Sequence, residues 1–271
     1  MGYVDIPLWR LALALGLVLV AMLISRGAAL RLERELAWGA ARAAAQLIAI
    51  GYLLRALFAH ERPGWVLLAL AVMLLVAAWT SARRLRRGPA SRALLLYALA
   101  SIAAGAGVAL VPVFVFIVPP RPWFEARYLV PIGGMMLSSS MNVVALVLER
   151  LFASARAEAA TIEQLLALGA TPQQALAPCS RAALRAAMIP TINGLLTVGL
   201  VALPGMMTGQ IVGGVAPEQA VRYQIVIMYQ LVAATAISGA LSAMLARRLL
   251  FTPGAQLIVP PEPEPAKAKS G

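Results

Sequence analysis

The sequence contains one cysteine, Cys179, and one histidine, His60, in 271 residues. A single cysteine excludes an internal disulfide and a zinc cluster built from thiolates. A single histidine argues against histidine-based metal chemistry and against a Ser-His catalytic pair. The chain also lacks the Gly-x-x-x-x-Gly-Lys-Ser/Thr pattern that cradles nucleotide phosphates. We therefore expect no catalytic residues in this chain and no cofactor bound by it.

Charge is scarce, and apolar residues dominate instead. Only 13% of the residues are charged, 61% are hydrophobic, and the mean hydropathy is +0.83. The apolar residues form long runs, and a helix that crosses a bilayer needs about 20 of them. The sequence therefore predicts an all-α polytopic membrane protein. Its seven expected spans lie near residues 7–25, 36–58, 65–81, 93–117, 129–148, 190–212 and 221–246.

The net charge of +12 comes almost entirely from arginine. In a soluble protein such a charge would suggest nucleic-acid binding. Here the arginines gather in alternate connections between the apolar runs, which is typical of membrane topology. By the positive-inside rule we expect an external N-terminus, a cytoplasmic C-terminus and no nucleic-acid partner. Residues 1–250 would form one transmembrane domain, and the Pro- and Glu-rich residues 251–271 a disordered cytoplasmic tail.

One predicted cytoplasmic connection, residues 149–189, is long and structured. Its apolar periodicity predicts a helix that stops at Gly169, a second short helix that ends at Pro178, and a third helical stretch over residues 180–188. Two interpretations are open. The connection is either a solvated linker or a docking element that enters a groove on a partner and transmits its motion.

The second helix of this connection has a recognisable start. Thr171 is placed as its N-cap, Pro172 occupies its first position, and Gln174 completes a capping box. A tight turn held on both sides by capping residues favours the docking interpretation over a flexible linker.

A family resemblance begins at these residues. The stretch EQLLALGATP, from Glu163 to Pro172, resembles the EAA-type coupling loop of ABC transporter permeases. That loop carries an acidic residue and, six positions later, a glycine ahead of a short helix that docks on the ATPase. Gln164 and Leu165 depart from the two alanines of the pattern. The resemblance implies an ATPase-coupling role for Glu163, Gly169, Ala170, Thr171, Pro172 and Gln174.

The resemblance extends over nearly the whole chain to about residue 250. The segments GATPQQAL, RAALRAAMIPTIN, TVGLVALPGMMTGQIVGG and RAAAQLIAIGYLLRALF resemble the FetB-type permease family. This is a family of bacterial iron-export permeases with plant relatives implicated in aluminium tolerance. The resemblance implies an ABC permease subunit of the bacterial inner membrane, forming a homodimer. A separate ATPase subunit would bind the ATP and magnesium and drive iron export.

A candidate substrate pathway lies in the sixth predicted span. The Pro204-Gly205 step is expected to break this helix within the membrane, where freed carbonyls can face a cation. Met206 and Met207 offer thioethers next to the break, and two further residues offer oxygen ligands, Thr208 and Gln210. The alternative is that this segment serves only as a packing face at a homodimer seam.

The fifth predicted span adds Met141 and Asn142, which follow a run of three serines. Such a polar run at membrane depth must face protein or water, so it is either part of the substrate pathway or a packing seam. The expected spans contain no carboxylate, so the identity of any metal site stays unknown and iron enters by resemblance alone. An ABC permease for a non-metal solute, or an ATP-independent secondary transporter or channel, remains the alternative.

Overall fold

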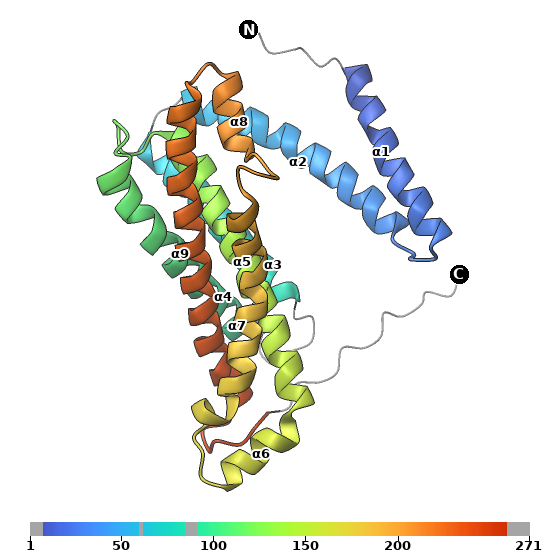
Figure 1. Ribbon diagram of the computed structural model, residues 1–271, viewed down its shortest axis with the longest axis vertical. Coiled ribbons are helices and arrows are strands. Elements are labelled where there is room, and N and C mark those ends of the chain that lie inside the picture. Colours follow the sequence, from blue (N-terminus) through green and yellow to red (C-terminus); the bar gives the residue numbers. More distant parts are fainter. Residues whose placement is uncertain (1–7, 60–61, 85–90, 259–271) are drawn as a thin grey trace. The chain divides into compact units, whose positions relative to one another are not determined.

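The computed structural model describes residues 8–59, 62–84 and 91–258. In this part of the chain all regular structure is helical, with two isolated β-bridges and no strand, which confirms the all-α fold class. Figure 1 shows the succession of helices. They are α1 (Leu8–Gly27), α2 (Glu33–Ala59), α3 (Pro63–Arg84), α4 (Ser91–Pro112), the π-helix η1 (Val113–Ile117), α5 (Ala126–Ala157), α6 (Ala159–Ala167), α7 (Pro172–Thr197), α8 (Gly205–Val212) and α9 (Pro217–Leu250).

The chain divides into two compact units, Met1–Glu61 and Arg62–Gly271. In the first unit α1 and α2 pack against each other. The hydroxyl of Ser25 donates to Glu33 Oε1 at 3.2 Å and accepts the backbone N–H of Leu32 at 3.0 Å. This hydroxyl therefore satisfies a backbone donor at the start of α2 and fixes the turn between two apolar helices.

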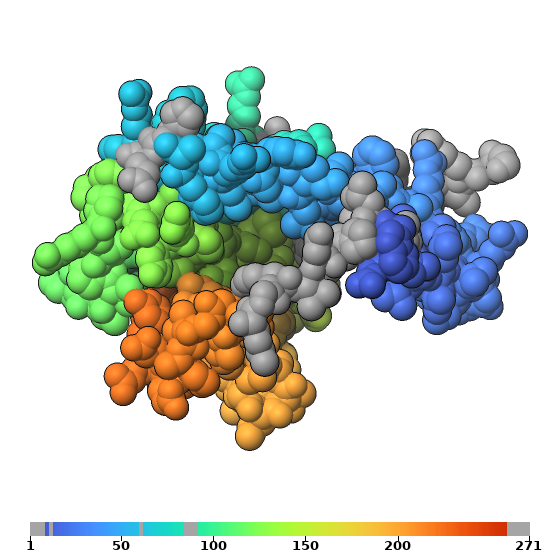
Figure 2. Space-filling view, turned by 90° about the horizontal axis from the view of Figure 1, so that it is seen from above, coloured from blue at the N-terminus to red at the C-terminus, as the bar shows by residue number. Residues whose placement is uncertain are grey.

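The second unit is a bundle organised around α5 and α9. Helix α9 packs against α4, α5, α7 and α8, whereas α5 also packs against α3 and α4. Figure 1 shows α5 and α9 running along most of the length of this unit. Their shared core includes Ile102, Met136, Leu148 and Ile227, each at most 2% exposed. The space-filling view in Figure 2 shows the α8 end of this unit.

The contact between α4 and α9 depends on the small size of Gly105. A Cβ atom at this position would overlap the Ser238 hydroxyl and lie 2.5 Å from the carbonyl oxygen of Ala234. Farther along the same contact, the side-chain amide of Gln230 donates to the carbonyl oxygen of Ala109 at 3.2 Å. Small residues that let helix backbones approach, and polar side chains that bridge helices, are both typical of membrane bundles.

Five described helical segments are long and apolar enough to cross a membrane. They are Glu33–Ala59, Pro63–Arg83, Arg92–Ile117, Ala126–Ala157 and Pro217–Leu250. They match the second, third, fourth, fifth and seventh predicted spans. The first predicted span coincides with α1, of which Leu13–Gly27 counts as a shorter apolar helix.

The sixth predicted span, residues 190–212, is interrupted as expected, but the interruption is longer than the Pro204-Gly205 step and the helix before it starts much earlier. Helix α7 starts at Pro172 and runs through Pro190 to Thr197. The chain then turns, with Gly199 at a φ of +83°, and short α8 begins only at Gly205. The helix therefore ends several residues before the predicted Pro204-Gly205 break. Ala183 and Ala187, within two turns before Pro190, are buried, and their packing compensates for the backbone donor that Pro190 lacks.

We expect a Gly105→Ala substitution to lower the free energy of unfolding by about 1–3 kcal/mol, because the added methyl group overpacks the α4–α9 contact. The measurement is the midpoint of unfolding of the purified protein in detergent. Gly107→Ala is the matched control, since a Cβ there meets no atom within 4 Å. Equal midpoints for both variants would contradict the close α4–α9 approach.

Candidate functional site

A helical hairpin extends beyond the bundle. Helix α5 continues past residue 148, the predicted end of the fifth span, and ends at Ala157. The backbone of Glu158 then leaves helical geometry (φ −104°, ψ 20°), and α6 follows it. We call residues 158–179 the α6–α7 hairpin. Figure 1 shows α6 and the start of α7 together at the end of the unit opposite α8.

The turn of this hairpin is closed by backbone hydrogen bonds around Gly169. This residue has a φ of +89°, which favours glycine. Its N–H donates to the carbonyl of Leu166 at 3.0 Å, and the N–H of Ala170 donates to that of Leu165 at 3.0 Å. Together these bonds form a Schellman motif, so the predicted helix stop at Gly169 is confirmed.

The predicted start of α7 is confirmed as well. The backbone N–H of Gln174 donates to Thr171 Oγ1 at 3.3 Å, and the N–H of Thr171 donates to Gln174 Oε1 at 2.9 Å. Pro172 occupies the first turn, where a missing N–H costs nothing. The turn is therefore held on its α6 side by glycine and on its α7 side by a capping box.

The prediction that Pro178 ends this second helix is wrong, and the third helical stretch over residues 180–188 is not a separate helix. Helix α7 passes through Pro178 without a break. The neighbouring side chains Leu176 and Cys179 are buried at 0% and 2% exposure. We attribute the continuity to this buried face, whose packing offsets the single hydrogen bond that a proline removes.

The hairpin is anchored on its inner side to the bundle core. Ile162 of α6 and Leu176 of α7 belong to the same buried cluster as Phe152 of α5. The thiol of Cys179 donates to Glu158 Oε2 at 3.5 Å. Burial of the thiol, then the negative charge and hydrogen bond of Glu158, raise the pKa of Cys179 to about 11. The hairpin is thus a packed extension of the core.

Helix α9 and the residues after it also contact the hairpin region. In the amide orientation that satisfies both groups, the side-chain oxygen of Gln173 accepts from the Arg247 guanidinium at 2.9 and 3.2 Å. The N–H of Ile258 donates to the carbonyl of Leu250 at 2.8 Å, and Phe251 and Leu257 pack on the core cluster. The tail predicted from residue 251 thus begins with a hydrogen-bonded turn. Residues 259–271 lie outside the described residues.

The tip of the hairpin, in contrast, is open. Leu168 is 85% exposed, and it directly precedes Gly169. Glu163 is exposed on α6, whereas Ala170 is half-buried. A rigid turn that presents one large apolar side chain has the geometry of a docking element.

The predicted substrate residues around α8 are engaged mainly in packing. Pro204 is the N-cap of α8, and Thr208 Oγ1 donates to the carbonyl oxygens of Pro204 and Gly205 at 3.3 and 3.0 Å. Met207 is buried, and Met206 packs against the core cluster. The pathway role of these residues stays a prediction. One polar atom is left over, because Gln210 Oε1 is buried without a hydrogen-bond partner in the structure.

Met141 and Asn142 face different surroundings although they are neighbours. The carbonyl oxygen of Met141 accepts from the Ser81 hydroxyl at 3.1 Å, and its side chain packs on the core. Asn142 is exposed and lines a cavity. Neither Met206 nor Met207 lines this cavity, so the structure does not bring Asn142 together with the two methionines there.

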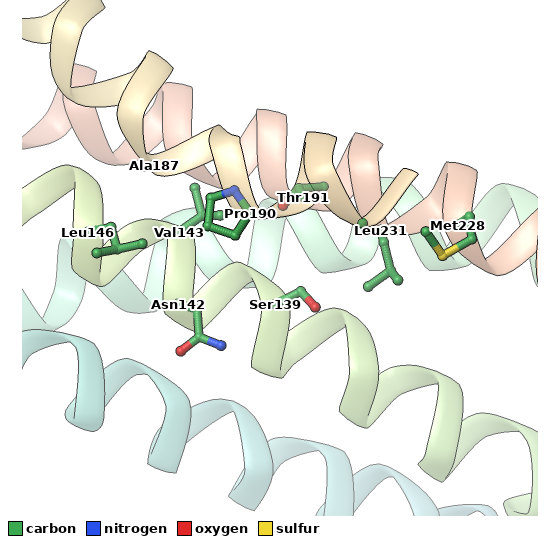
Figure 3. Close-up of a pocket in the computed structure, with 10 residues that line it drawn as sticks. Ser139, Asn142, Val143, Leu146, Ala187, Pro190, Thr191, Met228 and Leu231 are labelled. Carbon is green, nitrogen blue, oxygen red and sulfur yellow. The ribbon is translucent and has the colours of Figure 1, made fainter. Parts of the chain in front are cut away.

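The cavity has a volume of about 260 Å³ and lies between α5, α7 and α9. Figure 3 shows side chains from all three helices around it. Its lining combines neutral polar and aliphatic groups. It consists of Ser139, Asn142, Val143, Leu146, Ala187, Pro190, Thr191, Gly194, Met228 and Leu231.

Sequence reasoning did not identify the α7 and α9 walls of this cavity. The signal that was available is the polar step from Pro190 to Thr191 inside an apolar helix. Among the described residues, no group of three or more His, Cys, Asp or Glu side chains lies close enough to hold a metal ion.

Comparisons with known proteins place these features in a family context. The profile described as "Uncharacterised protein family (UPF0014)" matches residues 8–251. The chain is 38% identical to a UPF0014 membrane protein of Synechocystis over 90% of its own length and 94% of the relative's. It is 37% identical to the "Probable iron export permease protein FetB" of Escherichia coli, covering 92% and 94%. The "Protein ALUMINUM SENSITIVE 3" of Arabidopsis thaliana is 36% identical, covering 91% and 88%. No solved structure matches the chain.

We expect Cys179 to resist alkylation in the folded protein. Its pKa is raised from 9.0 to about 11, so the folded state favours the neutral thiol. The associated stabilisation is complete below pH 9 and is lost as the pH rises through 11. Iodoacetamide labelling at pH 8, followed by mass spectrometry, should be about a hundredfold slower than in the denatured chain.

The matched variant for this prediction is Glu158→Gln. It removes the negative charge but leaves the burial, which is the larger cause, so the pKa of Cys179 should fall only part of the way to its ordinary value. Labelling of the folded variant should be faster than in the parent and still slower than in the denatured chain. Labelling of the folded parent at the denatured rate would contradict the buried Cys179–Glu158 contact.

Proposed function

Because the chain belongs to the UPF0014 family of membrane proteins, we propose that it is the permease subunit of an ABC transporter. In this proposal a separate ATPase subunit supplies the energy, and the cargo is iron or another metal, as an ion or chelate. The permease activity and the iron are supported by the name of the Escherichia coli relative. The ABC assignment is supported by the coupling-loop resemblance from Glu163 to Pro172.

The observation that carries the proposal is the α6–α7 hairpin. It combines a turn fixed by Gly169 and Thr171, an inner side buried in the bundle core, and an exposed apolar tip at Leu168. A partner that bound this tip could move the bundle, because the hairpin shares its buried core with the bundle. The partner would bind the ATP and magnesium, for which this chain has no phosphate-binding loop.

The proposed topology puts the hairpin in the cytoplasm of the bacterial inner membrane. Arginines cluster on and beside it, as the positive-inside rule requires: Arg150, Arg156, Arg181, Arg185, Arg247 and Arg248. Seven crossings, with α7 and α8 together forming the sixth, put the N-terminus outside.

We also propose a homodimer. Asn193 is exposed on α7, and an exposed amide in hydrocarbon needs protein or water beside it.

The proposed mechanism is alternating access. Closure of two ATPase subunits on ATP would draw the hairpins of the two permeases together. Since α7 is one helix from Pro172 to Thr197, a displacement at the hairpin reaches the middle of the bundle directly. Helices α5 and α9 pack against α7 and would tilt with it. Cargo would then be released to the outer side.

We expect Leu168→Asp to abolish co-purification of the ATPase and to lower ATP-dependent transport at least fivefold, because a carboxylate cannot enter an apolar groove without losing its hydration. The measurement uses the permease co-expressed with its candidate ATPase subunit, then reconstituted in vesicles. Transport and ATP hydrolysis are followed with iron and with other metals.

The control is Ala153→Asp, which puts the same charge at an exposed site of α5 ahead of the hairpin. It should leave the complex intact. If Leu168→Asp binds the ATPase as tightly as the parent, the hairpin tip is not the docking element. If the parent moves cargo without ATP, the protein is a secondary transporter or channel, and the ABC proposal fails.

A further inference from the structure

The cavity between α5, α7 and α9 contains polar groups that nothing in the described chain satisfies. Ser139 and Asn142 reach it from α5, and Thr191 reaches it from α7. None of these three side chains has a hydrogen-bond partner among the described residues. Polar side chains within a membrane bundle are normally paired. Their convergence on one cavity therefore indicates that something else occupies their donors and acceptors.

Helix α7 adds a further acceptor beside the cavity. Pro190 lines the wall and has no N–H, so the carbonyl of Ala186, one turn earlier, lacks its usual helical donor. The hydroxyls and the amide supply both donors and acceptors. The site thus matches the hydrogen-bonding pattern of a neutral polar solute or of bound water.

The same cavity lacks charge. Every residue of its described lining is neutral, and the remaining wall is apolar, including Met228 and Leu231 of α9. A bare divalent cation would lose its hydration here and find no carboxylate in return, and such desolvation costs far more than a few neutral dipoles restore. An anionic complex meets the same penalty without a cationic partner. An uncharged, partly apolar solute loses little on entering.

We propose that this cavity is the cargo site and that it selects solutes without net charge, so that a metal crosses as a neutral chelate whose organic ligands face the protein. This inference rests on the proposed permease function and specifies its substrate class. Ser139, Asn142 and Thr191 bind the oxygens of the chelating ligands, while Met228 and Leu231 contact their apolar edges. The metal itself stays coordinated by its own ligands and makes no bond to the protein.

The test offers the same metal to the purified permease, without its ATPase, in three species that differ in net charge. The probes are radioactive zinc as the free Zn²⁺ ion, as neutral bis(maltolato)zinc in excess maltol, and as the dianionic zinc–EDTA complex. Binding is measured by scintillation proximity. We expect saturable binding of the neutral complex at least tenfold tighter than that of either charged form.

Three variants make the test specific to the cavity. Asn142→Leu removes the amide at similar size and should weaken the neutral complex at least tenfold, whereas Ser138→Ala should bind like the parent. Ser138 is an exposed α5 neighbour of Ser139 that does not line the cavity. Asn142→Asp supplies the missing counter-charge and should gain saturable binding of free Zn²⁺. Because Asn142→Leu changes the same position and should not gain this binding, the gain would be specific to the added carboxylate.

Two results would overturn the proposal. One is parent protein that binds the free ion or the anionic complex as tightly as the neutral one. The other is unchanged binding of the neutral complex by Asn142→Leu together with no gain for Asn142→Asp. Because the ATPase takes no part, either result leaves the hairpin docking proposal standing. Conversely, a failed docking experiment leaves the binding result unaffected.

Discussion

In the hydrocarbon of a bilayer there is no water to hydrogen-bond the backbone, so every polar group must find its partner inside the protein or in a water-filled space. This constraint accounts for the helical character of the described chain and for the polar contacts between its helices. Gln230 reaches the backbone of α4, and Ser81 reaches that of α5. Ser139, Asn142 and Thr191, which are exposed or half-buried and have no hydrogen-bond partner among the described residues, line a cavity of the bundle.

The polar backbone groups of the α6–α7 hairpin, which we propose lies outside the hydrocarbon, are also paired within the protein. The backbone donors and acceptors of its turn form hydrogen bonds within the turn, in the Schellman motif at Gly169 and the capping box at Thr171. Its side chains Ile162 and Leu176 continue the apolar core of the bundle. Hairpin and bundle therefore share one core, and the hairpin moves with α5 and α7. The apolar side chain left over at the tip is the part available to a partner.

Local chemistry made the hairpin turn predictable. A positive φ needs glycine, and Thr171, Pro172 and Gln174 are the residue types that start a helix, so both ends of the turn could be read from four positions. The course of α7 could not be read in this way. Pro178 and Pro190 signal helix ends locally, and only the burial of the faces beside them keeps the helix continuous. The cavity as a whole was not predicted for a related reason, since its polar walls come from helices far apart in the sequence. Only the polar run of the fifth predicted span, which ends at Asn142, was identified. Met206 and Met207 of α8 were proposed as thioether ligands, whereas in the structure Met207 is buried and Met206 packs against the core cluster.

Helix α7 has mechanical properties that follow from its two prolines. It begins at the hairpin turn and reaches the cavity wall at Pro190, about 27 Å away at 1.5 Å per residue. A continuous helix of this length is stiff along its axis but yields in bending wherever a hydrogen bond is missing. Pro178 and Pro190 place two such compliant joints, one at the base of the hairpin and one at the cavity. A push along α7 would arrive at the cavity nearly undiminished, whereas a sideways load would be absorbed at the joints. The direction of force, as well as its size, would then decide whether the cavity changes shape.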